Sequence, residues 1–211
     1  MAVQGSAKGR RPGNRDTRGE ILTAARHTFA AKGFAGASVR GIAAEAGVDA
    51  ALVHHYFDTK EQLFLATVDI PIVLTDLIDH VTASGLDGLG DRMIRTILSV
   101  WDSELQPSLV GAVRTALTDP GLTRSISEFL TLEVIGRILR TVQVPEPEAS
   151  RRASLVASQV LGVIIGRYVL KLPPLVAQST DQLAAAIGPT LQRYLTGDLP
   201  EPAAETGAKE G

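Results

Sequence analysis

The chain has 211 residues, 45% of them hydrophobic, which is enough for one large or two modest domains with a buried core. It has no cysteine, which excludes disulfides, thiolate catalysis and cysteine metal sites. The net charge of −2 is unevenly distributed, because residues 1–60 hold nine Lys or Arg against five acidic residues and the remainder holds 12 against 18. A basic N-terminal part followed by an acidic remainder indicates that the N-terminal part faces a polyanion.

The first 14 residues are rich in Gly, Ala, Lys and Arg and have no apolar periodicity, so we predict a disordered basic arm over residues 1–14. The arm is either a solvated tail or a segment that follows DNA phosphates or enters a minor groove. It is not followed by the unbroken apolar segment of a signal peptide, and the longest apolar stretch, residues 155–172, is interrupted by polar side chains. We therefore expect a cytoplasmic protein without a membrane span.

The stretch from residue 38 to residue 60 has the pattern of a helix-turn-helix. Ser38 can cap a short helix whose apolar residues recur at helical spacing, and Gly47 supplies the positive φ that ends it. Asp49 then caps a second helix after a turn of about three or four residues, the length typical of this motif. On the second helix we expect an outward face made of Ala50, Ala51, His54, His55 and Tyr56.

Capping patterns on both sides extend this unit. The pattern Thr17–Glu20 predicts the start of an earlier helix that ends at Gly33, and the pattern Thr59–Gln62 predicts the start of the next one. Together these signals predict an N-terminal head with a three-helix helix-turn-helix fold, over residues 15–68.

Pro71 marks the boundary between this head and the rest of the chain, because proline inside a helix removes a hydrogen bond and clashes with the preceding turn. Beyond it, apolar residues recur at helical spacing and no useful segment alternates with period two. We therefore predict an all-α protein with a helical body over residues 69–197 and a disordered tail over residues 198–211. Pro71 is a candidate hinge between head and body.

The segment from Glu148 to Lys171 is apolar on more than one face and therefore needs burial on two sides. Two glycines spaced four apart in it permit close approach of another helix. We predict a homodimer contact here in preference to burial within one subunit, since symmetric dimers are the commonest oligomers. The predicted interface residues are Val160, Gly162, Val163, Gly166, Leu191 and Tyr194.

Several short motifs occur between residues 17 and 68, namely Lys32-Gly33-Phe34, Ser38-Val39-Arg40-Gly41-Ile42-Ala43, Ala46-Gly47-Val48, His55-Tyr56-Phe57 and Lys60-Glu61-Gln62-Leu63-Phe64. Together they resemble the TetR-type (tetracycline-repressor-like) transcriptional regulators. The resemblance implies a homodimeric, ligand-responsive DNA-binding regulator, a repressor that binds a near-palindromic double-stranded operator. It also implies a small-molecule inducer bound by the body, and no metal or other cofactor.

The resemblance also assigns roles to single residues. Arg40 and either His54 or His55 would approach base edges, and Ala50 would offer an apolar contact to a thymine methyl group. Asp49 is assigned to capping, since a carboxylate facing phosphates would be repelled. Which of the arginine and the two histidines reads bases stays open, because His54 stands where the family pattern usually has tyrosine. Phosphates would be held by Ser38, Tyr56, Thr59 and Lys60.

Within the body, five residues are candidates for an inducer cavity between helices, the alternative being ordinary core: Met93, Trp101, Arg114, Phe129 and Arg137. Two other functional classes explain the sequence less well. An enzyme is disfavoured because the chain has four histidines, no cysteine and no phosphate-binding loop after a strand. A helical small-molecule-binding or partner-binding protein without DNA function leaves the basic head unexplained. Steeply salt-dependent DNA binding distinguishes these classes from a regulator.

Overall fold

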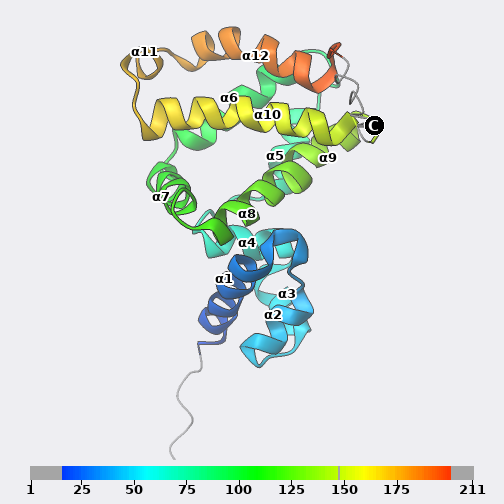
Figure 1. The fold of residues 1–211 in the computed structure, drawn as a ribbon, viewed down its shortest axis with the longest axis vertical. Coiled ribbons are helices and arrows are strands. Elements are labelled where there is room, and N and C mark those ends of the chain that lie inside the picture. Colours follow the sequence, from blue (N-terminus) through cyan, green and yellow to red (C-terminus); the bar gives the residue numbers. More distant parts are fainter. Residues whose placement is uncertain (1–15, 147, 201–211) are drawn as a thin grey trace, which may run out of the picture.

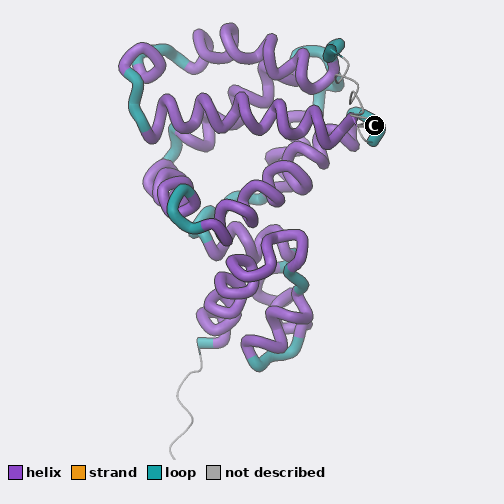
Figure 2. The backbone as a smooth tube through the Cα atoms, viewed as in Figure 1, coloured by secondary structure: helices purple, strands orange, loops and turns teal. Residues whose placement is uncertain are grey.

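The computed structural model describes residues 16–146 and 148–200, and all regular structure in those ranges is helical (Figures 1 and 2). The predicted all-α class is therefore confirmed. The molecule is elongated, with a small head at one end, coloured blue to cyan in Figure 1, and a larger body at the other. The predicted arm over residues 1–14 and most of the predicted tail over residues 198–211 lie outside the described residues.

The head is built from short helices that pack on one another. They are α1 (Thr17–Gly36), α2 (Val39–Ala46), α3 (Ala50–Phe57) and α4 (Lys60–Thr67). The first three form the head proper, with α2 and α3 joined by the short turn that the sequence predicts, and α4 leads from the head to the body.

Side-chain caps fix the starts of three of these helices. The side-chain oxygens of Ser38, Asp49 and Thr59 accept hydrogen bonds from backbone N–H groups two or three residues further along the chain. Gly47 ends α2 with a φ of 65°, a conformation that glycine adopts without strain. These predicted starts and stops are confirmed.

The start of α1 differs from the prediction. Its cap is Asp16, whose carboxylate accepts a hydrogen bond from the N–H of Gly19, and Thr17 is already helical. The negative charge of aspartate at a helix N-terminus favours this choice. Gly33 does end the first stretch of helix as predicted, because its φ of 74° and ψ of 172° are not helical, and a short further turn beyond this kink extends α1 to Gly36.

The body begins after a non-helical segment, residues 70–73, that contains Pro71. The break that proline predicts is present, although α4 ends three residues before the segment starts. The body elements are α5 (Leu74–Thr82), α6 (Leu89–Trp101), α7 (Gln106–Ala116), α8 (Pro120–Glu128), the π-helical segment η1 (Phe129–Ile135), α9 (Gly136–Thr141), α10 (Glu148–Ile164), the π-helical segment η2 (Ile165–Val169), α11 (Pro173–Val176) and α12 (Thr180–Thr196).

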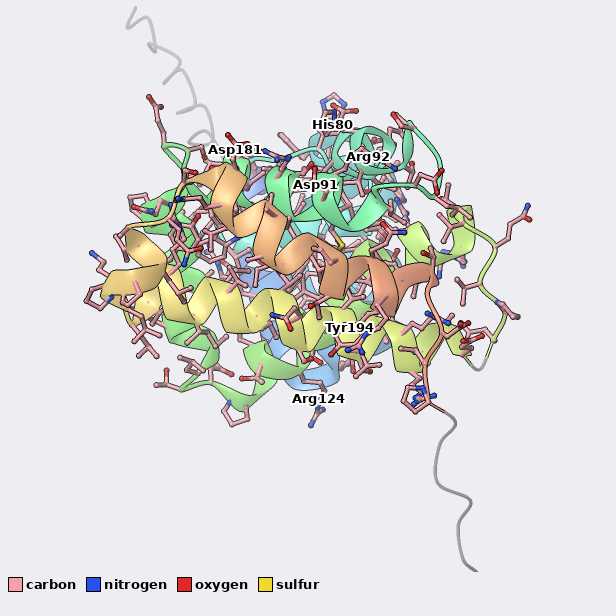
Figure 3. All side chains as sticks on the ribbon, turned by 90° about the horizontal axis from the view of Figure 1, so that it is seen from above. His80, Asp91, Arg92, Arg124, Asp181 and Tyr194 are labelled. Atoms are coloured by element: carbon pink, nitrogen blue, oxygen red, sulfur yellow. The ribbon has the colours of Figure 1, made fainter. Side chains whose placement is uncertain are left out.

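Figure 3 looks down on the end of the body away from the head, where α10 and α12 lie side by side. The most extensive packing in the body is between α6 and α12, which approach closely at two glycines. A Cβ atom on Gly90 would lie 2.3 Å from the carbonyl oxygen of Gly188, so neither helix could approach this closely with a larger residue at position 90. Gly162, one of the two glycines predicted to permit close approach of another helix, has open space beside it within the subunit, since a Cβ there would meet nothing within 4 Å.

Within the described ranges, no helix combines the length and apolar character needed to cross a lipid bilayer.

Candidate nucleic-acid interface and effector cavity

The residues predicted to contact DNA lie on α2, on α3 and around the start of α4. Two of them, Ala50 and Lys60, are half-buried, and the others are exposed. The full set is Ser38, Arg40, Ala50, His54, His55, Tyr56, Thr59 and Lys60.

α3 has one buried side and one open polar side. Val53 and Phe57, one helical turn apart, are 2% and 6% exposed and pack in the core of the head. The three residues between them, His54, His55 and Tyr56, are all exposed. Because the buried pair fixes the rotation of the helix, these polar side chains are displayed in a defined direction.

The two adjacent histidines have different surroundings. The Nδ1 atom of His54 lies 2.7 Å from the carbonyl oxygen of Asp58. A carbonyl oxygen only accepts, so Nδ1 carries the proton and Nε2 is left for an outside partner. The ring of His55 packs edge-on against Tyr56, with the centroids 5.4 Å apart. Both rings remain available to a ligand, and the choice between them as base-reading residues stays open.

Lys60 is engaged inside the head. Its Nζ donates hydrogen bonds to the carbonyl oxygens of Phe34 at 3.0 Å and Ala37 at 3.3 Å, and it lies 4.2 Å from the centroid of the Phe34 ring. The hydrogen bonds satisfy carbonyl groups at the end of α1 that have no partner within the helix, and the ring contact is a cation–π interaction. The predicted phosphate contact of Lys60 would have to use its remaining donor, or break these bonds.

Arg40 is the exposed cation best placed for an outside partner. No carboxylate of residues 16–146 or 148–200 forms an ion pair with it. By contrast, Arg18 lies 5.2 Å from the centroid of the Phe57 ring, and Arg26 donates to the carbonyl oxygen of Thr67 at 3.0 Å. A free guanidinium at the start of α2 can approach a base edge or a phosphate.

Glu45 holds α2 against α1. Its carboxylate accepts a hydrogen bond from the Thr28 hydroxyl at 2.8 Å and lies 2.5 Å from Nδ1 of His27. The hydrogen bond from Thr28 and then the one from His27 lower the pKa of Glu45 below its ordinary value of 4.5. The charged form of Glu45 therefore stabilises the folded head.

We expect Glu45→Gln to reduce the pH dependence of folding stability. Because the pKa of Glu45 is lower in the folded state, its contribution is complete above its ordinary value and is lost as the pH falls through the folded value. The melting temperature of the unmodified protein should fall more steeply than that of the variant between about pH 6 and about pH 3. Circular dichroism melts measure this, with Glu104→Gln, an exposed body carboxylate, as the control. Equal slopes for all three proteins would contradict the assignment.

Four phenylalanine rings join the head to the body. Phe129 of η1 lies 5.4 Å from the Phe34 ring and 5.0 Å from the Phe64 ring, centroid to centroid, and Phe29 lies 5.8 Å and 5.1 Å from the same two rings. All four side chains are at most 5% exposed. The rings come from α1, α4 and η1, so η1 is in direct contact with the core of the head.

α8 makes a second connection between body and head, and Figure 1 shows it next to α1. The buried hydroxyl of Ser125 donates to the carbonyl oxygen of Phe29 at 2.8 Å, and the carboxylate of Glu128 accepts from the N–H of Ala35 at 2.7 Å. Gly121 permits this approach, since a Cβ there would lie 2.3 Å from a backbone oxygen of α1. The head is thus joined to the body by the Pro71 segment, by the ring contacts of η1 and by α8.

A partly open apolar cavity has a volume of about 190 Å³. It lies between the end of α4, the segment after it, and helices of the body, including η1 and α10. Three of the predicted pocket residues line it, namely Met93, Trp101 and Phe129.

The two predicted pocket arginines do not line this cavity. Arg114 is exposed on α7. Arg137 pairs with Glu133 at 3.4 Å and lines a separate groove of about 630 Å³ between head and body, together with Arg18 and Tyr56. Most of the aliphatic residues that line the apolar cavity were not predicted. Helical periodicity identifies the apolar face of a helix, but it does not identify which other helix packs against that face.

Most of the predicted dimer residues are buried inside the subunit. Val160, Val163 and Leu191 are 8%, 5% and 0% exposed, and a Cβ atom on Gly166 would collide with the side chain of Leu175. These residues are covered because α10 and α12 pack onto the rest of the body. Gly162 is exposed and Tyr194 is half-buried, and both lie on the α10–α12 end of the molecule, where Figure 3 labels Tyr194.

Two family models match the sequence. Residues 21–67 match the family described as bacterial regulatory proteins, tetR family. Residues 87–195 match the family described as tetracyclin repressor-like, C-terminal domain. The first match covers the head and the second covers the body from α6 to α12.

Individual proteins are also similar to the chain. The HTH-type transcriptional regulator BetI of Agrobacterium fabrum is 30% identical over 173 residues, which is 77% of this chain and 82% of that protein. The BetI regulator of Brucella anthropi is 47% identical over 51 residues, 24% of this chain and 26% of that protein. The crystal structure of a TetR-family regulator from Streptomyces coelicolor is 37% identical, covers 89% of this chain and 99% of that chain, and has a TM-score of 0.42.

Proposed function

The chain belongs to the TetR family of bacterial transcriptional regulators, and on that premise we propose that it is a homodimeric repressor released from its operator by a small molecule. The observation that carries the proposal is the open face of α3. His54, His55 and Tyr56 are displayed on a helix held by buried Val53 and Phe57, within the part of the chain that matches the DNA-binding family model. We place this activity in the cytoplasm, on double-stranded DNA.

In this proposal α3 enters the major groove. Arg40 and one of the two α3 histidines approach base edges, and Ala50 offers an apolar contact to a thymine methyl group. Two heads reach half-sites in successive major grooves, which requires their recognition helices to be about 34–36 Å apart. Phosphate contacts are assigned to Ser38, Tyr56, Thr59 and the remaining donor of Lys60.

The homodimer sets that spacing. We assign the contact to the exposed side of α10 and α12, which lie together at the end of the body away from the head. Gly162 and Tyr194 are the members of the predicted set that are still accessible there. A two-fold axis through this face brings the same patch of each subunit together, as a symmetric dimer requires.

The effector is proposed to act through the apolar cavity, because the cavity wall includes residues that connect the head to the body. Phe64 and Val68 come from the end of α4 and its continuation, Ile70 precedes Pro71, and Phe129 packs between head and body. An effector that fits one arrangement of these residues better than the other shifts the population away from the DNA-bound state, by as much as its differential affinity. The head, residues 15–68, and the body, residues 69–197, are the proposed functional units.

We expect Arg40→Ala to weaken operator binding by about 1–3 kcal/mol, the usual worth of one specific guanidinium contact. The operator is first obtained by selecting bound DNA from a random pool, and affinity is then measured by fluorescence anisotropy at several salt concentrations. Arg114→Ala is the matched control, since it removes an exposed arginine from the body and should leave affinity unchanged.

The salt dependence distinguishes the possible roles of Arg40. A guanidinium bound to a base edge gives weaker binding with relaxed sequence preference at one position, whereas a phosphate contact weakens all sequences alike and reduces the log–log salt slope by about one. If the Arg40 and Arg114 variants bind the selected DNA equally well, Arg40 is not part of the interface. If no sequence is enriched and binding is independent of salt, the DNA-binding proposal fails.

A further inference from the structure

We propose that the body cavity takes an uncharged, mainly hydrocarbon molecule of one or two rings, and that it rejects anions and cations of the same size. This inference rests on the proposed role of the cavity as the effector site. It concerns the chemistry of the ligand, which follows from the side chains that face the cavity.

The cavity wall offers almost no polar group. Among the described residues, those lining the cavity have aliphatic, thioether or aromatic side chains, and the only side-chain hydrogen-bond donor among them is the indole N–H of Trp101. A charged ligand would lose its hydration without gaining a counter-charge, which is strongly unfavourable in an apolar interior. A neutral ligand avoids this cost, and one hydrogen-bond acceptor is the most that the wall can satisfy.

The charged groups next to Trp101 already have partners of their own. The Tyr168 hydroxyl donates to Asp102 at 2.9 Å, and Arg167 lies 3.7 Å from the same carboxylate and donates to backbone carbonyl groups that follow it in the chain. The Tyr168 ring packs against Trp101, with the centroids 5.1 Å apart. Unlike Trp101, the residues Asp102, Arg167 and Tyr168 do not line the cavity. Burial is the main cause that raises the pKa of Tyr168, so its hydroxyl remains protonated.

The volume limits the size of the ligand. The cavity measures about 190 Å³, somewhat more than the apolar cavity of about 150 Å³ that in another protein stays dry and binds benzene. A substituted benzene or two fused rings, about seven to ten non-hydrogen atoms, therefore fits without opening the body. The aromatic wall residues Phe64, Trp101 and Phe129 can contact such rings by edge or face.

The wall also contains a backbone feature that occurs frequently at functional sites. η1 is π-helical, and Phe129, Leu130, Val134 and Ile135 from its seven residues line the cavity. Because Phe129 of the same segment packs on Phe34 and Phe64, a ring in the cavity contacts the element that holds the head.

The chain carries its own reporter for this site. Trp101 is the only tryptophan in the sequence and it lines the cavity. A neutral heavy-atom quencher, iodobenzene, should therefore reduce its fluorescence saturably. The probes 4-iodobenzoate and 4-iodobenzylammonium add one negative or one positive charge to the same ring, and they should bind more than about 100-fold more weakly.

Two variants test whether the quenching of Trp101 fluorescence comes from iodobenzene bound in the cavity. Ala157→Leu adds side-chain volume to the wall and should weaken iodobenzene binding by at least about 10-fold, and Val134→Met tests the same point should the first variant not fold. Ala83→Leu makes the same chemical change at an exposed position after α5 and should bind as the unmodified chain does. Circular dichroism verifies folding. Equal binding of neutral and charged probes, or unchanged iodobenzene binding by both cavity variants, would overturn the inference.

Operator binding at saturating iodobenzene separates this inference from the proposed function. If iodobenzene occupies the cavity and the charged probes do not, the ligand chemistry stands, whether or not operator affinity changes. If operator affinity then does not change, the cavity is not the effector site and the proposed route of regulation fails. If a charged probe releases the operator from the unmodified chain and from Ala83→Leu but not from Ala157→Leu, the cavity is the effector site and the inference about its chemistry is wrong.

Discussion

Replacing Phe129 by alanine is expected to lower the free energy of unfolding by about 3–5 kcal/mol, the range for truncating a buried aromatic side chain. The ring is 5% exposed and packs against Phe34 and Phe64, so its loss enlarges the cavity and removes the aromatic contact between head and body. Urea denaturation followed by circular dichroism measures the effect. We also expect a broader transition, because head and body lose part of their cooperativity.

Phe129→Leu is the matched control. Leucine keeps most of the apolar volume and loses the ring contacts, so it should cost about 1–2 kcal/mol. Operator binding should follow the same order, with the alanine variant weakest, if η1 holds the head in its DNA-binding position. If the free energy of unfolding of Phe129→Ala lies within about 1 kcal/mol of that of the original chain, the head does not depend on this contact.

Replacing Arg152 by methionine is expected to lower the free energy of unfolding by about 2–4 kcal/mol. Arg152 is 7% exposed, and its guanidinium bonds Glu148 together with three carbonyl groups at the end of α12. Those carbonyls belong to Arg193, Tyr194 and Gly197, at 3.3, 2.9 and 2.8 Å. Methionine has similar length but makes none of these bonds. The carbonyl oxygens of Tyr194 and Gly197 lose their side-chain donor, whereas that of Arg193 keeps its bond from the N–H of Gly197. The loss of folding free energy is smaller than for breaking a fully buried ion pair, because the Glu148 side chain is 43% exposed and stays hydrated.

The neighbouring residue supplies the control for Arg152. Arg151 is half-buried and donates to the carbonyl oxygen of Pro200, so Arg151→Met should change stability by less than about 1 kcal/mol. Analytical ultracentrifugation of both variants also tests the proposed dimer. Arg152 fixes the end of α12 that carries Tyr194, so its loss should raise the dimer dissociation constant, whereas the Arg151 variant should not. Identical stability of the two variants would refute a structural role for Arg152.

The sequence predicted the features that depend on residues close together in the chain. Caps at Ser38, Asp49 and Thr59, the stop at Gly47 and the break at Pro71 each involve a backbone group no more than a few residues away. The same short-range motifs carried the resemblance to the TetR family, which the comparisons show. The cap at Asp16 was missed although it is equally local, because Thr17 offered a competing pattern one residue later.

Only the tertiary structure decided which apolar residues are accessible and which polar groups are free. Leu191 and Val163 belong to apolar stripes that the sequence assigned to a partner subunit, but α6 and the rest of the body cover them. Lys60 looks free in the sequence, yet its ammonium bonds carbonyl groups more than 20 residues earlier. The hydrogen bond that the N–H of Ala35 donates to Glu128 spans 93 residues. Helical periodicity gives the direction of each side chain about its own axis, whereas its partner depends on how the helices dock. The sequence by itself therefore determined the family, the helices and the exposed face of α3, and the packing of those helices determined the cavity, the α8 connection and the surface left for a second subunit.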